Sequence, residues 1–275
     1  MMIKQIHLIN QLCLCYNSAM NHIEKYYNKF NEDKRLESRH GIVEFSVSMA
    51  FIKKYLPTNH CKIIDIGAGT GKYSIALSKL GHDVTAVELV KKNLSMLQQK
   101  NSNVKAFQGN ALNLKKFKDN SFDITIMFGP MYHLFSTEDK VKALCEAKRV
   151  TKTGGYIFVA YLLADYALIR HGIMDNNIRQ AINNGKIDKA YNIIATEEDL
   201  YSYVRLPQIE EYNNMAGLTR SCIFSPDGPT DYIRQSINKL SEQDFEYFIS
   251  YQLANATRPD LLGASSHVVD VLIKQ

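Results

Sequence analysis

Residues 62–71 read Lys-Ile-Ile-Asp-Ile-Gly-Ala-Gly-Thr-Gly, a mainly apolar run that leads into three glycines at alternate positions. A short apolar run of this kind is typical of a buried strand. A strand that ends in a glycine-rich turn and opens a helix brings backbone N–H groups up to a ligand, because glycine has no Cβ atom to block the approach. The stretch therefore predicts a strand over 62–66, a ligand-binding turn and a helix over 70–80.

An acidic residue, Glu88, stands at the end of the next expected strand, residues 83–88. A carboxylate there can accept two hydrogen bonds from a ribose diol, so turn and acid together predict an adenosine-containing ligand. A nicotinamide dinucleotide is disfavoured, because its G-x-G-x-x-G pattern would place the third glycine at Lys72. The carboxylate of Asp65 would also face a pyrophosphate unfavourably, whereas it suits a positively charged ligand.

The remaining sequence alternates between strand and helix patterns. Strands are expected over 62–66, 83–88, 104–108, 122–128, 155–162, 217–225 and 267–274, and helices over 70–80, 90–100, 137–150 and 229–254. Gly154 and Gly155 are expected to end the third of these helices. The alternation predicts an α/β fold with a Rossmann-like, doubly wound sheet of seven strands, the last of them antiparallel.

Three segments lie outside this alternation. Residues 1–19 have polar interruptions that are wrong for a signal peptide, and we interpret them as a frayed helix or as a start assigned upstream of Met20. Residues 20–57 have apolar residues at three- and four-residue spacing and predict two helices with a break near Gly41. Residues 163–206 have helical spacing and no clear strand, and predict a cap inserted after the fifth strand of a domain spanning 58–275.

The composition is ordinary for a globular protein, with 45% hydrophobic and 22% charged residues. No apolar run approaches the roughly 20 residues of a membrane span. The net charge of +5 is dispersed, so no nucleic-acid surface is expected. The five cysteines are an odd number, and Cys13-x-Cys15 lacks the spacing of a metal knuckle. We therefore expect a cytoplasmic protein without a bound metal or a membrane partner.

The motifs resemble those of the class I S-adenosylmethionine-dependent methyltransferases. Residues 65–71 are similar to the family's first motif, 87–88 to its second, 109–111 to the turn that receives adenine, and 122–128 and 147–155 to the fourth strand and the approach to the fifth. The resemblance covers 62–162. It implies the strand order of that family, S-adenosylmethionine as the methyl donor and S-adenosylhomocysteine as the product. The N-terminal helices are similar to those that fold over the cofactor in bacterial small-molecule methyltransferases.

The resemblance also implies roles for single residues. Asp65 would contact the methionine amino group directly or through water, and Glu88 would hold the ribose hydroxyls. The side chain of Asn110 would meet the adenine amine, and the carbonyl of Phe128 would accept from the methionine ammonium. Arg39 or His40 could meet the cofactor carboxylate. The full set of expected cofactor-binding residues is Asp65, Gly67, Ala68, Gly69, Glu88, Leu89, Asn110, Ala111 and Phe128.

The acceptor side is expected to follow the fourth strand, at residues 129–133. Methyl transfer from a sulfonium needs alignment of the acceptor, and it needs a general base only if the acceptor must lose a proton. His133 is the candidate base, and the alternative is a histidine that caps the next helix or packs under the cap. Gly129 offers no side-chain acceptor for an adenine amine, which argues against DNA. The expected cap favours a small-molecule acceptor; an RNA or protein methyltransferase and a non-catalytic cofactor-binding module remain alternatives.

Overall fold

The computed structural model describes all residues except 1–22, 25, 28–36, 58 and 101. Its strands are β1 (Lys62–Ile66), β2 (Asp83–Glu88), β3 (Lys105–Gln108), β4 (Phe122–Met127), β5 (Thr151–Leu162), β6 (Thr219–Phe224) and β7 (His267–Ile273). Its α-helices are α3 (Arg39–Tyr55), α4 (Lys72–Lys79), α5 (Lys91–Gln99), α6 (Thr137–Val150), α7 (Ala164–Ala167), α8 (Ile178–Asn183), α9 (Leu206–Ala216), α10 (Arg234–Ile237), α11 (Glu242–Asn255) and α12 (Pro259–Leu262). The described residues also form a 3-10 turn, η1 (Pro130–His133), and a π-helical segment, η2 (Leu168–Met174).

The seven strands form one sheet in the order β3-β2-β1-β4-β5-β7-β6. The pairs from β3 to β5 are parallel, and β7 runs antiparallel to both of its neighbours. The predicted α/β fold and its antiparallel last strand are therefore confirmed. In this topology the C-terminal ends of β1, β2, β4, β5 and β6 share one edge of the sheet with the N-terminal end of β7.

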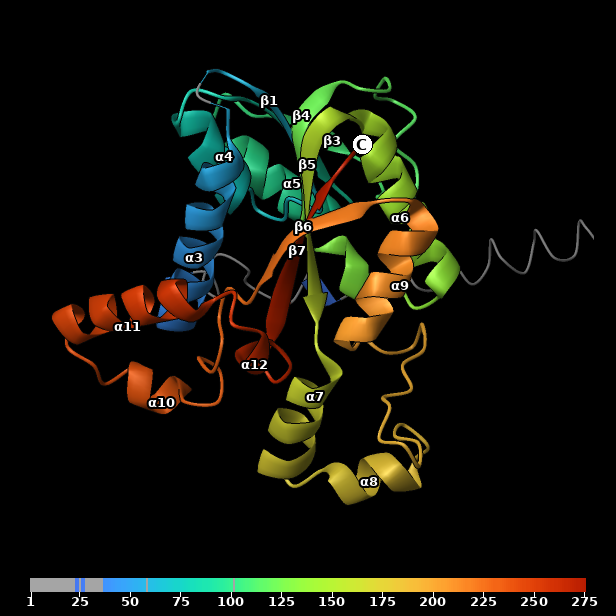
Figure 1. Cartoon of the computed structure of the whole chain (residues 1–275), viewed down its shortest axis with the longest axis vertical. Coiled ribbons are helices and arrows are strands. Elements are labelled where there is room, and N and C mark those ends of the chain that lie inside the picture. Colours follow the sequence, from blue (N-terminus) through green and yellow to red (C-terminus); the bar gives the residue numbers. More distant parts are fainter. Residues whose placement is uncertain (1–22, 25, 28–36, 58, 101) are drawn as a thin grey trace, which may run out of the picture.

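Helices cover both faces of the sheet, with α6 and α9 on one face and α3, α4 and α11 on the other (Figure 1). Successive strand residues point to opposite faces, as the pleat requires. Thus Ile64 packs with the α6 and α9 side chains, while its neighbour Ile63 packs with α3 and α4. The same alternation separates Val159 from Phe158 on the central strand β5. Burial on both faces explains why these strands are continuous apolar runs in the sequence.

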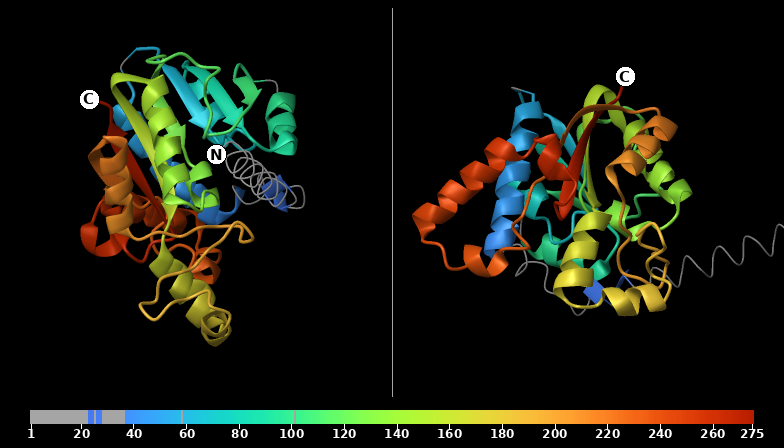
Figure 2. Two further views of the ribbon diagram at one scale, coloured as in Figure 1. Left: turned by 90° about the vertical axis from the view of Figure 1, so that its right-hand side faces the viewer. Right: turned by 60° about the horizontal axis from the view of Figure 1, so that its bottom comes forward.

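Residues 163–206 carry α7, η2 and α8 and extend beyond the sheet edge (Figures 1 and 2). The segment leaves and returns at neighbouring points, because Leu163 and Val204 form a parallel bridge. The Ala164 N–H donates to the Val204 carbonyl at 2.9 Å, and the Val204 N–H donates to the Leu162 carbonyl at 3.0 Å. These bonds hold both ends of the segment against the end of β5.

Several expected element boundaries were wrong. The helix expected over 229–254 is broken into α10 and α11, because the Ser241 side chain caps a new helix by accepting from the Asp244 N–H at 3.1 Å. Helix α6 ends at Val150 without Gly154 and Gly155, which lie inside β5 where its register with β4 shifts. Gly41 lies in the first turn of α3, which is capped by Ser38.

The prediction for residues 1–19, including Cys13 and Cys15, lies outside the described residues. Of the first expected helix, only Ile23, Glu24, Tyr26 and Tyr27 are described before residue 37, and they are helical. Among the described residues, no helix combines the length and the apolar character needed to cross a membrane.

A buried ion pair joins the last two strands. Asp270 of β7 is fully buried, and its carboxylate accepts from the Arg220 Nε of β6 at 2.7 Å and from the Asn213 Nδ2 of α9 at 2.6 Å. Burial raises the pKa of Asp270, and the Arg220 guanidinium opposes that rise. The carboxylate therefore depends on its partners to remain charged inside the sheet–helix interface.

We predict that Arg220→Met lowers the free energy of unfolding by roughly 3 kcal/mol, because it leaves a buried carboxylate without its cation. Urea denaturation measures the change. Arg258→Met is the matched control, since Arg258 and its partner Asp260 both lie at the surface, where solvent screens the ion pair and its loss should leave the free energy of unfolding almost unchanged. Equal destabilisation by the two substitutions would show that burial does not set the strength of the Asp270 pair.

Candidate functional site

A cavity of about 760 Å³ opens at the edge of the sheet where β1, β2, β4 and β5 end. The turns that follow β1, β2 and β4 form one side of the cavity. The opposite side is formed by the end of β5, the start of β7, and residues of the 163–206 segment. Ligands of doubly wound sheets bind at this edge. All nine residues that the sequence predicted for cofactor binding line this cavity: Asp65, Gly67, Ala68, Gly69, Glu88, Leu89, Asn110, Ala111 and Phe128.

The three glycines of the turn have left-handed backbones, with φ of +75° at Gly67, +56° at Gly69 and +87° at Gly71. Their surroundings differ. A Cβ atom on Gly67 would lie 2.7 Å from Pro130 Cδ, and one on Gly71 would lie 2.1 Å from Leu97 Cδ1. A Cβ atom on Gly69 would meet no protein atom within 4 Å. Gly67 and Gly71 are thus required by packing, whereas Gly69 leaves open space on the cavity side for a ligand.

Glu88 fixes the turn to the end of β2. Its Oε2 accepts from the Gly69 N–H at 2.7 Å and its Oε1 accepts from the Val90 N–H at 2.8 Å. Burial raises the pKa of the Glu88 carboxyl, and these backbone donors oppose the rise. Glu88 as a whole is only 5% exposed, yet it lines the cavity. It presents oxygens that can accept hydroxyl protons, as binding of a ribose requires.

Asp65 is the second buried carboxyl of this half of the cavity. Its Oδ2 accepts from the Ser74 hydroxyl of α4 at 2.5 Å. Burial raises the pKa of Asp65 to about 6, the Ser74 hydrogen bond opposes the rise, and the nearby Glu88 adds to it. A cation bound beside Asp65 would favour the ionised form, so the site suits an ammonium group.

The adenine-side turn is shaped by Asn110. Its Oδ1 accepts from the Leu112 N–H at 2.8 Å, which is an Asx turn, and the Gly109 N–H donates to the Glu88 carbonyl at 3.0 Å. These bonds hold the turn after β3 beside the end of β2. The side chain of Asn110 therefore has a local role in addition to any contact with a ligand.

His133 lies at the end of η1 with both ring nitrogens bonded. Its Nδ1 is 2.9 Å from the Leu200 carbonyl and its Nε2 is 3.0 Å from the Tyr27 hydroxyl. A carbonyl only accepts, so Nδ1 carries the proton and Nε2 accepts from Tyr27. Burial lowers the pKa of His133 to about 4, and the Leu200 bond opposes that fall. The neutral ring thus holds Tyr27 and the 163–206 segment together, and its basicity is low.

Arg39 and His40, the two side chains expected near the cofactor carboxylate, lie in different surroundings. Arg39 Nη1 donates to the Ile237 carbonyl at 3.0 Å and to the Leu240 carbonyl at 2.7 Å, and it does not line the cavity. His40 lines the cavity, and burial lowers its pKa. Arg39 thus fastens α3 to the segment around α10.

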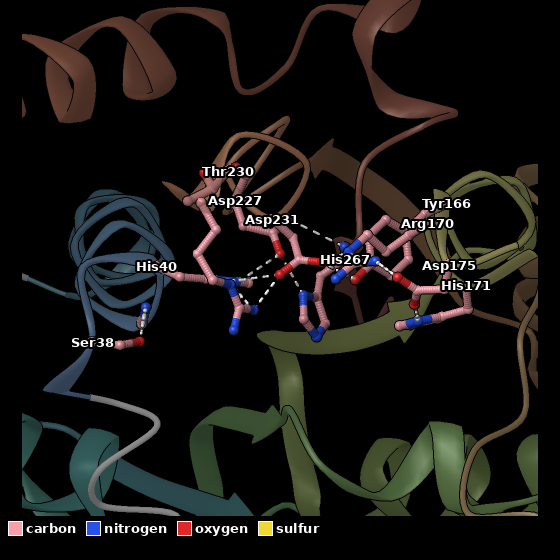
Figure 3. Close-up of polar contacts among 12 residues, drawn as sticks. Ser38, His40, Tyr166, Arg170, His171, Asp175, Asp227, Thr230, Asp231 and His267 are labelled. Carbon is pink, nitrogen blue, oxygen red and sulfur yellow. Dashed lines mark hydrogen bonds and ion pairs between the residues drawn. The ribbon is translucent and has the colours of Figure 1, made fainter. Parts of the chain in front are cut away.

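A second polar cluster faces the same cavity, and three of its members, Asp227, Asp231 and His267, are not among the residues predicted from the sequence. Figure 3 shows Asp227 and Asp231, from the segment after β6, between His40 of α3 and the side chains of His267 and Tyr166. The His267 Nδ1 lies 2.6 Å from Asp227 Oδ2, and the Tyr166 hydroxyl donates to Asp231 Oδ2 at 2.5 Å. The signal available in the sequence was a histidine that opens the last strand, but its partner is 40 residues away.

Known proteins match part of the chain in sequence. Residues 64–159 match the family described as the methyltransferase domain. Demethylmenaquinone methyltransferase of Staphylococcus aureus is 33% identical over 138 residues, which cover 46% of this chain and 55% of that protein. The chain therefore matches only about half the length of this curated relative.

Solved structures share the fold. A Thermotoga maritima protein described as an S-adenosylmethionine-dependent methyltransferase, possibly a histamine N-methyltransferase, aligns with a TM-score of 0.59 at 19% identity over 94% of this chain and 100% of its own. Geranyl diphosphate C-methyltransferase of Streptomyces coelicolor aligns with a TM-score of 0.53 at 13% identity, over 84% of this chain and 79% of its own. At these identities the likeness concerns the fold alone.

We predict that the imidazole of His133 stays neutral, with the proton on Nδ1, from pH 8 down to pH 5.5, because burial holds its pKa near 4. Ring ¹⁵N chemical shifts measured across this range in the full chain should show no titration for this residue. A midpoint between pH 6 and 7 would instead mean that the ring is solvated and that Tyr27 does not occupy its Nε2.

Proposed function

We propose that this chain, which carries a methyltransferase domain over residues 64–159, is an enzyme that transfers a methyl group from S-adenosylmethionine to a small molecule. The observation that carries the proposal is the shared cavity of Gly69, Asp65 and Glu88. Gly69 leaves room for a ligand beside the turn, Glu88 offers acceptors for a ribose, and Asp65 offers a buried carboxyl for an ammonium.

The residues present fit this donor. S-adenosylmethionine supplies an electrophilic methyl group on a sulfonium. Glu88 would bind the ribose hydroxyls, Asp65 and the Phe128 carbonyl would bind the ammonium, and the Asn110 turn would bind adenine. The carboxylate of Glu88 is already oriented by Gly69 and Val90, so little reorganisation accompanies binding.

A small acceptor is supported by the other half of the cavity. Tyrosines from η1 and from the 163–206 segment line it, and they present flat apolar faces with polar tips: Tyr132, Tyr166, Tyr201 and Tyr203. The ring of Tyr201 packs edge-on against Tyr132 at 5.6 Å between centroids. A cavity of about 760 Å³ lies within the usual range for small-molecule sites, and it has to hold both donor and acceptor.

A methyl-transfer screen tests the acceptor class. Radiolabelled S-adenosylmethionine is incubated with the protein and with separate pools of small molecules, RNA and proteins. The small-molecule pool includes a naphthoquinol and histamine, because the names of the two similar proteins mention related compounds. Label in small molecules alone is the expected result. Label confined to RNA or protein would overturn the small-molecule assignment.

We predict that Glu88→Ala weakens S-adenosylhomocysteine binding by about 1–3 kcal/mol, roughly fivefold to 150-fold, because charged hydrogen bonds to the ribose are lost. Isothermal titration calorimetry gives the affinity. Glu146→Ala is the matched control, since that carboxylate also accepts a backbone N–H, from Leu114 at 2.5 Å, but does not line the cavity. A similar affinity in both variants would contradict the assigned role of Glu88.

We also predict that affinity for S-adenosylhomocysteine falls about tenfold between pH 7.5 and pH 5. The Asp65 carboxyl, with its pKa raised to about 6, is ionised above that pH and takes up a proton below it. Because the ligand's ammonium is attracted by the ionised form, binding weakens as the pH falls. Asp65→Asn removes this titration, so its affinity should vary less over the same range. Parallel pH profiles for the two proteins would exclude Asp65 as the source.

A further inference from the structure

The cavity has one arginine among its described lining residues, Arg234, the first residue of α10. Arg39 of α3 donates to the carbonyls of Ile237 and Leu240 at 3.0 Å and 2.7 Å, so α10 is fastened against α3. The first turn of α3 carries His40, which lines the same cavity. The fold thus places the side chain of Arg234 beside His40 at the cavity wall.

The guanidinium of Arg234 is held at one of its three nitrogens. Its Nη2 donates to His40 Nδ1, 3.2 Å away, and also bonds the Asp231 carboxylate. Because an arginine only donates, Nδ1 of His40 accepts, and the proton of the neutral ring is on Nε2, 3.5 Å from Asp227. Burial lowers the pKa of His40, which favours this neutral form. His40 and Asp231 therefore fix the direction of the guanidinium.

Asp231 is itself anchored on its other side. Its side chain is buried, its Oδ2 accepts from the Tyr166 hydroxyl at 2.5 Å, and the Arg170 Nε lies 3.2 Å away (Figure 3). Burial raises the pKa of Asp231, but Tyr166 and Arg234 outweigh that effect and hold it below its usual range. Asp231 is therefore an ionised carboxylate that Tyr166 and Arg170 keep in place, so the support for Arg234 is built in advance of any ligand.

Most donors of Arg234 are available to a ligand. A guanidinium carries five N–H groups, and only those on Nη2 have partners among the described residues. The side chain is 56% exposed, and its Nε and Nη1 carry the other three N–H groups. Arg149 and Arg220 differ, because each of them donates from Nε, Nη1 and Nη2 to other protein groups. A guanidinium that is held at one nitrogen and has open donors at the other two suits a carboxylate ligand.

The position of Arg234 separates it from the proposed donor site. Asp231 follows β6 in the chain, and its partner Tyr166 follows β5. Along the sheet edge β4 lies between β1 and β5, and two strand spacings of roughly 4.8 Å put the ends of β1 and β5 about 10 Å apart. The carboxylate of S-adenosylmethionine shares its α-carbon with the ammonium, which we place beside Asp65 at the end of β1. An anion bound by Arg234 therefore belongs to the methyl acceptor.

We propose that Arg234 binds a carboxylate of the methyl acceptor and that His40 and Asp231 are its positioning residues. This inference rests on the proposed function and adds the class of acceptor: a small molecule that carries a carboxylate besides the atom that is methylated. One guanidinium matches the single negative charge of a carboxylate. The contact holds the acceptor both before and during methyl transfer, so its loss raises KM more than it lowers kcat.

Binding of three probes tests the class of ligand without turnover. Benzoate, benzamide and benzylamine have one ring in common and are anionic, neutral and cationic near neutral pH. The cation is included because carboxylates also line the cavity, at Glu44, Asp139 and Glu197. Calorimetry on the full chain saturated with S-adenosylhomocysteine should give benzoate an affinity at least about tenfold higher than either of the other probes. Equal affinities, tighter binding of benzylamine or no binding of benzoate would overturn the proposal.

Substitutions at Arg234 test the residue itself. Arg234→Gln should weaken benzoate binding at least about tenfold, and Arg234→Lys should weaken it less, because lysine keeps the positive charge. Arg258→Gln is the matched control: the side chain of Arg258 has a similar exposure, 52%, and also pairs with an aspartate, but it does not line the cavity. Its benzoate affinity should equal that of the wild type. Unchanged benzoate affinity in Arg234→Gln would overturn the assignment.

The affinity for S-adenosylhomocysteine shows whose carboxylate Arg234 binds. In Arg234→Gln the Kd for S-adenosylhomocysteine should be unchanged, because the ammonium and the ribose keep their partners. A loss of about tenfold would mean that the guanidinium binds the carboxylate of the donor, and would overturn the assignment to the acceptor.

Turnover tests the role in the reaction. Radiolabelled S-adenosylmethionine is offered with separate pools of small carboxylic acids, of uncharged compounds and of amines without a carboxylate. Label should appear in the carboxylic acids, and Arg234→Gln should raise KM for the labelled acid at least about tenfold with little change in kcat. Label confined to the uncharged compounds or to the amines would overturn the acceptor class and leave the proposed function intact.

Failure of one proposal is distinguishable from failure of the other. No binding of S-adenosylhomocysteine to the wild-type chain would overturn the proposed function, and the benzoate comparison on the unliganded chain would then decide whether Arg234 holds an anion. Circular dichroism and thermal melting of each variant check that the fold is retained.

Discussion

The hydrogen bond from the Gly69 N–H to the Glu88 carboxylate, 2.7 Å long, is the contact on which the rest of the site depends. It joins the turn after β1 to the end of β2 at Gly69, whose left-handed backbone, with φ of +56°, is a conformation that glycine adopts readily. Leu97 of α5 and Pro130 of η1 pack where Cβ atoms on the flanking glycines would lie. The turn is therefore held from three sides, and Gly69 is left facing the cavity.

Much of the fold could be predicted because its signals are local. The strands at 62–66 and 83–88 are apolar runs that end at a glycine turn and at an acid, and the structure reproduces both ranges. The helix expected over 229–254 failed because Ser241 starts a second helix, a capping signal that the apolar spacing concealed. Inside β5, Gly154 resembles a helix stop in sequence, but the strand continues through a change of register.

The residues of the candidate site also fall into two groups: those with local signals in the sequence and those that only the fold brings together. Asp65, Gly69 and Glu88 follow one another along the chain and could be found from spacing alone. Asp227 and His267 come together only because β7 is inserted antiparallel between β5 and β6, so that its first residue meets the segment that follows β6. No pattern in the sequence indicates that pairing. For His133, the residue type suggested a base, but the sequence could not show that both ring nitrogens are hydrogen-bonded. Their partners, Tyr27 and Leu200, are distant from His133 in the sequence.

One cavity thus joins the turns after β1, β2 and β4, where we propose that the methyl donor binds, to the end of β5 and the start of β7. A crystal structure of the chain with S-adenosylhomocysteine tests this arrangement most directly. The account predicts the ribose hydroxyls on Glu88, the ammonium beside Asp65, and the sulfur facing the part of the cavity that Tyr132 and Tyr201 line. A ligand bound away from Glu88, or a sulfur atom turned away from these tyrosines, would contradict it.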